Sequence, residues 1–291
     1  MTIQNITVIG SGLMGRGIAQ VAALGGFRTT MVDITDEILH AALRNIREEM
    51  DKGIALGKLA AEQKDQALAR LFLEKNLEEA SQGADLVIEA VPEDMKMKIG
   101  TFGRVDKVAP SHTILASNTS SLSITEMAAC TSRAPRFVGM HFFNPVHKMK
   151  LLEIVTGLET TRETIKVAEE VGKQMGKDTI VVKESPGFIT SRINAMIGNE
   201  AFYMLQEGVA SAPDIDKAIK LGLNHPMGPF EMADLVGLDT RLHILEYLYD
   251  ALGEKFRPCP LMVQYVKAGR LGRKVGRGVY DYPQQAAPKK S

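Results

Sequence analysis

The sequence has little cysteine, no net charge and no long apolar run. Its 291 residues include two cysteines, Cys130 and Cys259, far apart and in no CxxC spacing. This pattern gives no disulfide framework and argues against a structural zinc site, so no metal is expected. Lys plus Arg and Asp plus Glu both total 35, which leaves a formal charge of zero. A neutral chain has no global field to attract nucleic acid or an anionic membrane, so neither is expected as a partner.

No apolar run approaches the roughly 18 residues needed to span a bilayer. The first residues, MTIQNITVIG, have no basic segment before their apolar stretch. These features predict a soluble, untargeted protein of the reducing cytoplasm. The length exceeds that of a usual single domain, so two domains are expected.

From Ile3 to about Lys183, short β-branched runs alternate with longer segments of helical period. This alternation predicts a Rossmann-like α/β domain, a mostly parallel sheet with helices on both faces. A long helical stretch from Asp36 to about Leu73 suggests a two-helix excursion from the sheet. The predicted strands lie near Ile6, Thr30, Val87, Ile114, Val138 and Val181.

The strand pattern stops at Ser185-Pro186-Gly187, and helical periodicity follows. We therefore predict three segments: an α/β domain over residues 1–184, a smaller all-α domain over 185–283, and a disordered tail over 284–291. Ser211 is a candidate N-cap for one of the later helices.

The first predicted strand runs into Gly10-Ser11-Gly12-Leu13-Met14-Gly15, a G-x-G-x-x-G motif that opens a helix. Such glycines permit a tight turn and close approach of a pyrophosphate to the helix N-terminus. Asp33 ends the second strand eighteen positions after Gly15, where a carboxylate can accept hydrogen bonds from the adenine ribose. Asp33 would repel a 2′-phosphate, which favours NAD over NADP. The alternative for Asp33 is a turn or helix-capping residue, a role that Thr35 or Asp36 can also fill.

His141 stands at the end of a predicted strand, and Glu153 lies in the apolar segment Leu151 to Val155. Pro145 turns the chain after the strand, so this segment can run back alongside and bring Glu153 near the imidazole. A histidine with a carboxylate partner can take a proton from a substrate hydroxyl while a hydride leaves the same carbon. The alternative is a pair of structural polar residues at strand edges.

A polar cluster, Ser117-Asn118-Thr119-Ser120-Ser121, follows another strand and should reach the same edge of the sheet. Its hydroxyls and amide could hydrogen-bond a substrate oxygen and the nicotinamide. The same residues could instead cap the next helix, for which Ser121 and Ser123 are candidates.

The sequence resembles the L-3-hydroxyacyl-CoA dehydrogenases, and most closely their bacterial 3-hydroxybutyryl-CoA members. The resemblance implies an NAD-binding domain, a helical domain that forms a homodimer, and reversible oxidation of an L-3-hydroxyacyl-CoA thioester, with a short chain expected. It is carried by GSGLMGRGIAQ, ASNTSSLSIT, GMHFFNPV, KLLEIV, SPGFI, LGLNHPMGPFEMADLVGLD and LGRKVGRGVYDY.

By matching position, the resemblance makes His141 the general acid/base, Glu153 its carboxylate partner, and Ser120 a contact to substrate and cofactor. Further cofactor-binding positions implied by the resemblance are Glu93, Lys98, Asn118, Asn144 and Lys274. Without the resemblance, Lys98 has the pattern of a solvated helix residue.

One position departs from the family pattern. The family has asparagine before the arginine that follows PGFI, whereas this chain has Ser191. Either Ser191 or Asn194, which lies on a similar helical face, is expected to take its place in holding substrate. Lys52 and Lys58 are candidates for the CoA phosphates, although each alone also fits an ordinary surface lysine.

Two other classes of function are consistent with parts of this pattern. An enzyme of the same architecture could oxidise a free hydroxy acid or sugar acid, and a regulatory protein could bind dinucleotide without turnover. The combination of His141, Glu153 and Ser120 argues against the second, because binding alone needs no acid/base pair.

Overall fold

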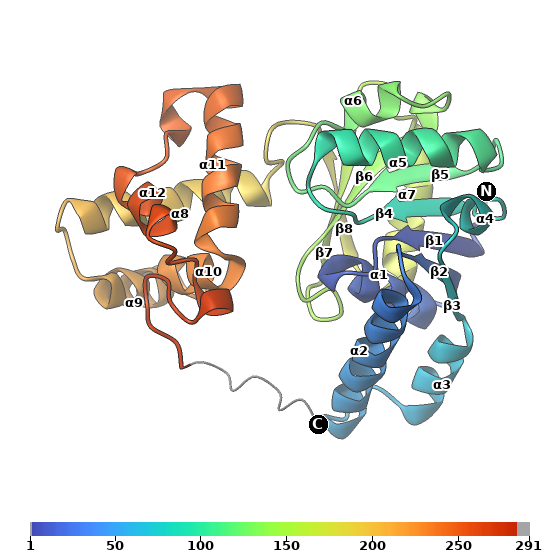
Figure 1. Cartoon of the computed structure of the whole chain (residues 1–291), viewed down its shortest axis with the longest axis horizontal. Helices are drawn as coiled ribbons and strands as arrows, with labels where there is room; N and C mark the ends of the chain where they lie inside the picture. Colours follow the sequence, from blue (N-terminus) through green and yellow to red (C-terminus); the bar gives the residue numbers. More distant parts are fainter. Residues whose placement is uncertain (1, 284–291) are drawn as a thin grey trace. The chain divides into compact units, whose positions relative to one another are not determined.

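The computed structural model describes residues 2–283, which form two compact units with a boundary between Ser185 and Pro186. The first unit contains an eight-stranded sheet, and the second is built from helices (Figure 1). The predicted tail, residues 284–291, lies outside the described residues.

The sheet has the strand order β3-β2-β1-β4-β5-β6-β7-β8. All neighbouring strands are parallel except β6 and β7. The predicted mostly parallel α/β sheet is therefore confirmed. The strands are β1 (Asn5–Ile9), β2 (Arg28–Val32), β3 (Leu71–Glu74), β4 (Leu86–Glu89), β5 (Ile114–Ser117), β6 (Phe137–Phe142), β7 (Leu151–Thr156) and β8 (Asp178–Lys183).

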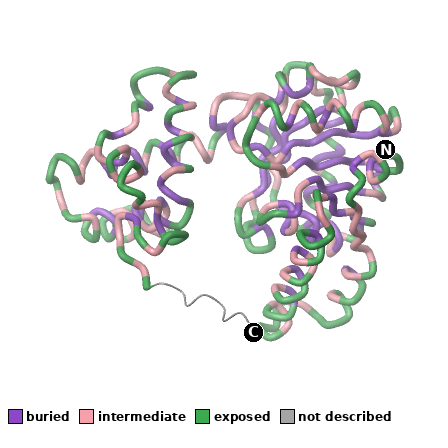
Figure 2. The backbone as a smooth tube through the Cα atoms, viewed as in Figure 1, coloured by how far each residue is buried: buried purple, intermediate pink, exposed green. Residues whose placement is uncertain are grey.

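Helices pack on both faces of the sheet, which is why its central strands are buried throughout (Figure 2). One face packs its alternate apolar residues against helices that include α1 and α7. On the other face, Phe102 of α5 stacks edge-on against Phe137 of β6 at 4.6 Å. The helices of this unit are α1 (Leu13–Leu24), α2 (Asp36–Ala55), α3 (Ala61–Ala69), α4 (Leu77–Ser81), α5 (Met95–Val108), α6 (Ile124–Ala129) and α7 (Arg162–Gln174), with a 3₁₀ turn η1 (Ala134–Arg136).

The long segment predicted as helical from Asp36 to Leu73 does contain two helices, α2 and α3, but its end is the strand β3. The prediction was wrong there because β3 is an edge strand of four half-buried residues, too short to establish an alternating pattern. Its pairing with β2 is reinforced by the guanidinium of Arg28, which lies 3.7 Å from the ring centre of Phe72.

Two capping alternatives are resolved in this unit. The hydroxyl of Thr35 accepts a hydrogen bond from Ile38 N–H and caps α2, so Asp33 is not used as that cap. Ser123, rather than Ser121, caps α6 by accepting from Glu126 N–H.

The second unit packs its helices around a separate core that includes Phe202, Phe230 and Leu245. Ser211 caps α9 as predicted, and Pro229 starts α10. The unit comprises α8 (Thr190–Gln206), α9 (Ala212–Gly222), α10 (Pro229–Val236), α11 (Leu238–Leu252) and α12 (Pro260–Lys267), with 3₁₀ turns η2 (Glu254–Phe256) and η3 (Arg273–Val275). No helix in the described part of the chain has the length and apolar composition needed to cross a membrane.

Candidate active site

The glycine motif forms the turn between β1 and α1. Gly10 has φ +87°, and a Cβ there would lie 2.7 Å from the carbonyl oxygen of Ala90. A Cβ on Gly15 would lie 1.7 Å from the carbonyl oxygen of Gly10, so the turn can close only with glycine at both positions. A Cβ on Gly12, by contrast, would meet no atom within 4 Å. Gly12 is the N-cap of α1 and has no side chain to cap the helix. The backbone N–H groups at the N-terminus of α1 therefore face open space, as the binding of a pyrophosphate requires.

Asp33 follows β2 and holds the same turn. Its Oδ2 atom accepts hydrogen bonds from the backbone N–H and the hydroxyl of Ser11, at 2.7 and 2.8 Å, and its Oδ1 atom accepts from Ile34 N–H at 2.8 Å. The carboxylate is therefore fixed beside the glycine turn, at the carboxyl ends of the parallel strands, where a dinucleotide-binding domain requires an acid.

His141 and Glu153 meet across the antiparallel pair β6–β7, in which they are directly opposed. The Nδ1 atom of His141 lies 2.6 Å from Oε2 of Glu153, and the two residues are 6% and 0% exposed. Because a carboxylate only accepts hydrogen bonds, Nδ1 carries the proton of this bond. In the neutral imidazole, Nε2 is then the nitrogen that can accept a proton. The two side chains are therefore in contact, as predicted.

The polar cluster after β5 forms a tight turn around Glu93. The Oε1 atom of Glu93 accepts hydrogen bonds from the Thr119 hydroxyl at 2.6 Å, from Ser120 N–H at 2.9 Å and from the Ser120 hydroxyl at 3.2 Å. Burial acts to raise the pKa of Glu93, but Lys98 and these donors outweigh it and hold the pKa below its ordinary value. Glu93 is therefore an ionised anchor for the turn that carries Ser120.

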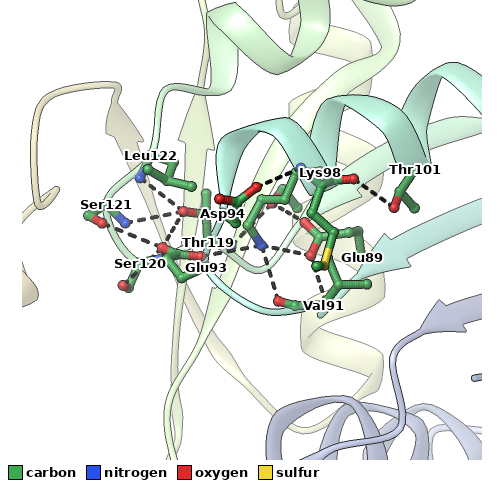
Figure 3. A network of polar contacts seen from close by, with 12 residues as sticks. Glu89, Val91, Glu93, Asp94, Lys98, Thr101, Thr119, Ser120, Ser121 and Leu122 are labelled. Carbon is green, nitrogen blue, oxygen red and sulfur yellow. Dashed lines mark hydrogen bonds and ion pairs between the residues drawn. The ribbon is translucent and has the colours of Figure 1, made fainter. Parts of the chain in front are cut away.

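Lys98 is buried, not solvated as its place in the sequence pattern suggested. Its Nζ atom lies 2.7 Å from Oε1 of Glu89 and 3.3 Å from Oε2 of Glu93 (Figure 3). Glu89 is 0% exposed and was not identified from the sequence. The available signal was its position: it ends the apolar run LVIE of β4, at the same edge of the sheet as Ser117 and His141.

The two predicted asparagines lie in different settings. Asn118 accepts a hydrogen bond from Phe142 N–H through Oδ1 at 3.0 Å, which ties the loop after β5 to the end of β6. Asn144 is exposed and lines a cavity of about 340 Å³ between α1, α2 and the loop after β6. Arg16, Asn45, Glu49 and Lys148 also line this cavity.

Lys177 is a second buried lysine that sequence reasoning missed. Its Nζ atom donates to the carbonyl oxygens of Val146 and, at 2.8 Å, of Met149. These carbonyls belong to the loop that follows β6, so Lys177 fastens the segment just beyond His141. No sequence motif marks this lysine, because its acceptors are backbone atoms.

Two predicted residues belong to the second unit. Ser191 lies in the first turn of α8, with Asn194 one turn further on, and both are half-buried. Lys274 lies in η3, and its Nζ atom is 2.6 Å from Oδ2 of Asp239. Burial acts to raise the pKa of Asp239, but Lys274 and backbone donors reverse the effect and lower it.

The candidate CoA-binding lysines are exposed. Lys52 lies near the end of α2 and pairs with Glu49 at 2.7 Å, while Lys58 lies in the turn after the helix. Among residues 2–283, no group of three His, Cys, Asp or Glu side chains is placed to hold a metal ion.

This sheet topology, with an open glycine turn at the first helix and an acid after the second strand, defines the class of dinucleotide-binding proteins. The residues present fit NAD: the turn leaves room at Gly12, and Asp33 is ionisable beside it. A buried histidine–carboxylate pair, His141 with Glu153, lies at the same edge of the sheet.

Comparison with known proteins specifies the family. Residues 5–185 match the family model for the NAD binding domain of 3-hydroxyacyl-CoA dehydrogenase, and residues 187–282 match the model for its C-terminal domain. The chain belongs to the 3-hydroxyacyl-CoA dehydrogenase family and is an NAD-dependent oxidoreductase.

Similar proteins cover nearly the full length. The chain is 46% identical to the probable 3-hydroxybutyryl-CoA dehydrogenase of Bacillus subtilis, over 99% of this chain and 100% of that protein. It is 42% identical to the mitochondrial hydroxyacyl-coenzyme A dehydrogenase of Sus scrofa, over 96% and 91%. The crystal structure of (S)-3-hydroxybutyryl-CoA dehydrogenase from Ralstonia eutropha superposes with a TM-score of 0.94 at 45% identity, over 97% and 100%.

Proposed function

We propose that the protein oxidises the 3-hydroxyl group of a short-chain L-3-hydroxyacyl-CoA, such as 3-hydroxybutyryl-CoA, to the 3-ketoacyl-CoA, and that it also catalyses the reverse reaction. The observation that carries this proposal is the 2.6 Å contact between His141 Nδ1 and Glu153 Oε2 at the edge of an NAD-binding sheet. The names of the similar proteins, 3-hydroxybutyryl-CoA and hydroxyacyl-coenzyme A dehydrogenases, support the choice of a CoA thioester.

His141 acts as the general base in the oxidation. Its Nε2 atom accepts the proton of the substrate hydroxyl as the bond between hydrogen and C3 breaks, and it returns that proton in the reverse direction. Glu153 accepts the hydrogen bond from Nδ1–H, which orients the ring, and it stabilises the imidazolium that forms when Nε2 takes the proton. When bound, NAD supplies the hydride acceptor.

The remaining site residues bind and orient. The Gly10–Gly15 turn receives the pyrophosphate and Asp33 the adenine ribose. Ser120 contacts substrate and cofactor from its turn on Glu93. Asn118, Asn144 and Lys274 complete the cofactor site, and Ser191, or Asn194 in its stead, holds the substrate.

The phosphates of CoA are proposed to bind near α2, with Lys52 and Lys58 as the cationic groups. Both lysines are exposed and so are accessible to a large anionic ligand. Because each is one of many surface lysines, charge reversal of the pair tests them better than single changes. The variant with both lysines changed to glutamate should raise KM for the thioester about 10-fold and leave kcat nearly unchanged.

The proposed homodimer uses the second unit. Helix α8 exposes Ile193 and Met196, and the end of α9 exposes Leu221, with Leu223 just beyond it. These residues are 53%, 40%, 76% and 64% exposed, in that order. Exposed apolar residues gathered on one pair of helices are typical of a protein interface. Light scattering coupled to gel filtration should give a dimer mass for the native chain and a monomer mass for Leu221→Glu with Leu223→Glu.

The central experiment measures NADH formation with 3-hydroxyacyl-CoA thioesters of increasing chain length, with NAD and with NADP, beside the corresponding free hydroxy acids. We expect the highest kcat/KM with a short thioester and NAD. A preference for the free acids would refute the proposal and favour a hydroxy-acid dehydrogenase of the same architecture.

A further inference from the structure

Lys98 lies between two carboxylates at the carboxyl end of β4. It is 1% exposed, and its ammonium group contacts Glu89 at 2.7 Å and Glu93 at 3.3 Å (Figure 3). The two acids differ in their surroundings: the side chain of Glu89 is 0% exposed, whereas that of Glu93 is 32% exposed. The lysine therefore bridges an interior carboxylate to one at the surface of the site.

Glu89 is surrounded by hydrogen-bond donors. Besides Lys98, the N–H of Val91 donates to its Oε1 atom at 2.7 Å, and the hydroxyl of Ser117 donates to its Oε2 atom at 2.6 Å. Val91 lies in the loop that leads to Glu93, and Ser117 ends β5 just before the Thr119–Ser121 turn. One buried side chain thus fixes both segments that meet at Glu93.

Glu93 in turn holds Ser120 in place. Its Oε1 atom accepts from the backbone and hydroxyl of Ser120 and from the hydroxyls of Thr119 and Ser121. Its Oε2 atom faces Lys98. Lys98 is almost fully buried, and its contact with Glu93 links it to the turn that carries Ser120.

We propose that Glu89 is a positioning residue of the active site, because its ion pair with Lys98 sets the place of the Glu93 carboxylate and thereby the Thr119–Ser121 turn. This inference rests on the proposed function, in which Ser120 contacts substrate and cofactor. It assigns to Lys98 an indirect role as the bridge, and to Glu89 the role of its interior counter-charge.

The charge of Glu89, rather than its shape, is the active property. The variant Glu89→Gln keeps an oxygen that accepts from Lys98 and Val91, and its amide can donate to the Ser117 hydroxyl. It removes the negative charge and turns the Ser117 hydroxyl from donor to acceptor in this contact, a change for which Ser117→Ala is the control. Lys98 then has a single counter-charge, Glu93, and is drawn toward it, which displaces the anchor of the turn.

The experiment is a double-mutant cycle with Glu89→Gln and Lys98→Met, measured by NADH binding through fluorescence and by kcat and KM. In the native background, Glu89→Gln should weaken NADH binding and lower kcat/KM by about 10-fold each, the size of coupling expected for a buried ion pair. In the Lys98→Met background, the same change should cause no further loss, because the charge that it balances is gone.

Two matched variants separate this role from a structural one. Glu78→Gln, in α4, breaks a surface ion pair with Arg104 of α5, the helix that carries Lys98, and should leave NADH binding unchanged. Ser117→Ala removes the hydrogen bond to Glu89 and the acceptor of Thr119 N–H, but no charge, and should weaken NADH binding less than Glu89→Gln does. Losses that add in the double variant, or a fully tolerated Glu89→Gln, would overturn the proposal.

The comparison remains decisive if Glu89→Gln alone fails to fold. The double variant retains neither charge, so it can be compared directly with Lys98→Met. Equal NADH affinities for these two proteins support the proposal, and weaker binding by the double variant contradicts it. A native chain that binds NADH but does not oxidise thioesters would instead refute the proposed function, leaving the binding cycle interpretable.

Discussion

His141 and Glu153 are directly opposed in the antiparallel pair β6–β7, with Nδ1 of the imidazole 2.6 Å from Oε2 of the carboxylate. The contact follows from register, since residues opposed across two strands project to the same face of the sheet. A one-residue slip of β7 would move Glu153 to the opposite face.

Replacement of Glu153 by glutamine tests the role of this carboxylate. The amide can present its NH₂ group to Nδ1, which favours the tautomer with the proton on Nε2 and disables the base. We expect kcat to fall by about 10²-fold or more, with KM changed little. Steady-state kinetics check this, with Glu159→Gln, an exposed acid beyond β7, as the control. Unchanged kcat in Glu153→Gln would exclude the pair from proton transfer.

Asp33 is expected to determine the choice of cofactor. Changing it to serine removes the negative charge beside the glycine turn and an acceptor for Ser11. KM for NAD should rise about 10-fold, and the preference for NAD over NADP should narrow, because a 2′-phosphate no longer meets a carboxylate. The control is Asp36→Asn, an exposed acid at the start of α2. A preference ratio that stays constant in Asp33→Ser would contradict this assignment.

The substitution of Ser191 for the family's asparagine gives a separate prediction. Ser191→Ala should raise KM for the thioester several-fold, the effect of one lost hydrogen bond. Ser191→Asn should leave this KM unchanged or lower it. If both variants behave like the native enzyme, Ser191 does not bind substrate, and Asn194→Ala becomes the variant to measure.

The titration of Lys177 should make the free energy of unfolding depend on pH. Burial, with Lys150 nearby, lowers the pKa of Lys177 to about 8 from an ordinary value of 10.5. The folded state therefore binds fewer protons than the unfolded state between these two values, so the free energy of unfolding should rise with pH across that window. Below pH 8 the folded protein bears the cost of a buried charge.

This rise should disappear in Lys177→Met and persist in Lys173→Met, an exposed lysine of α7. The pKa shift of Lys177 sets an upper limit of about 3 kcal/mol on the rise in the free energy of unfolding of the native protein. Urea unfolding at several pH values from 7 to 10.5 measures it. Parallel pH profiles for the native chain and Lys177→Met would show that this lysine titrates normally.

Much of the first unit could be predicted from local sequence. The strands β4, β5 and β6 are continuous apolar runs, because helices cover both of their faces, and such runs are distinctive. The edge strand β3 lacked this signal: its four residues are half-buried and depend on pairing with β2.

The site was predictable where position along a strand determines it and unpredictable where tertiary contact does. His141 and Glu153 could be paired from the turn at Pro145 together with the apolar segment Leu151 to Val155 that follows it. Lys98, by contrast, looked like any lysine on a helix surface, because its burial depends on Glu89, nine positions away on another element. Lys177 gave no signal because its partners are carbonyl groups of a distant loop.

The most direct test of the account is the rate of NADH formation by His141→Gln with 3-hydroxybutyryl-CoA and NAD. Glutamine can accept a hydrogen bond but cannot take a proton at neutral pH. The account predicts a loss of about 10³-fold in kcat, with native folding and native NADH affinity. A correctly folded His141→Gln that forms NADH at the native rate would contradict it.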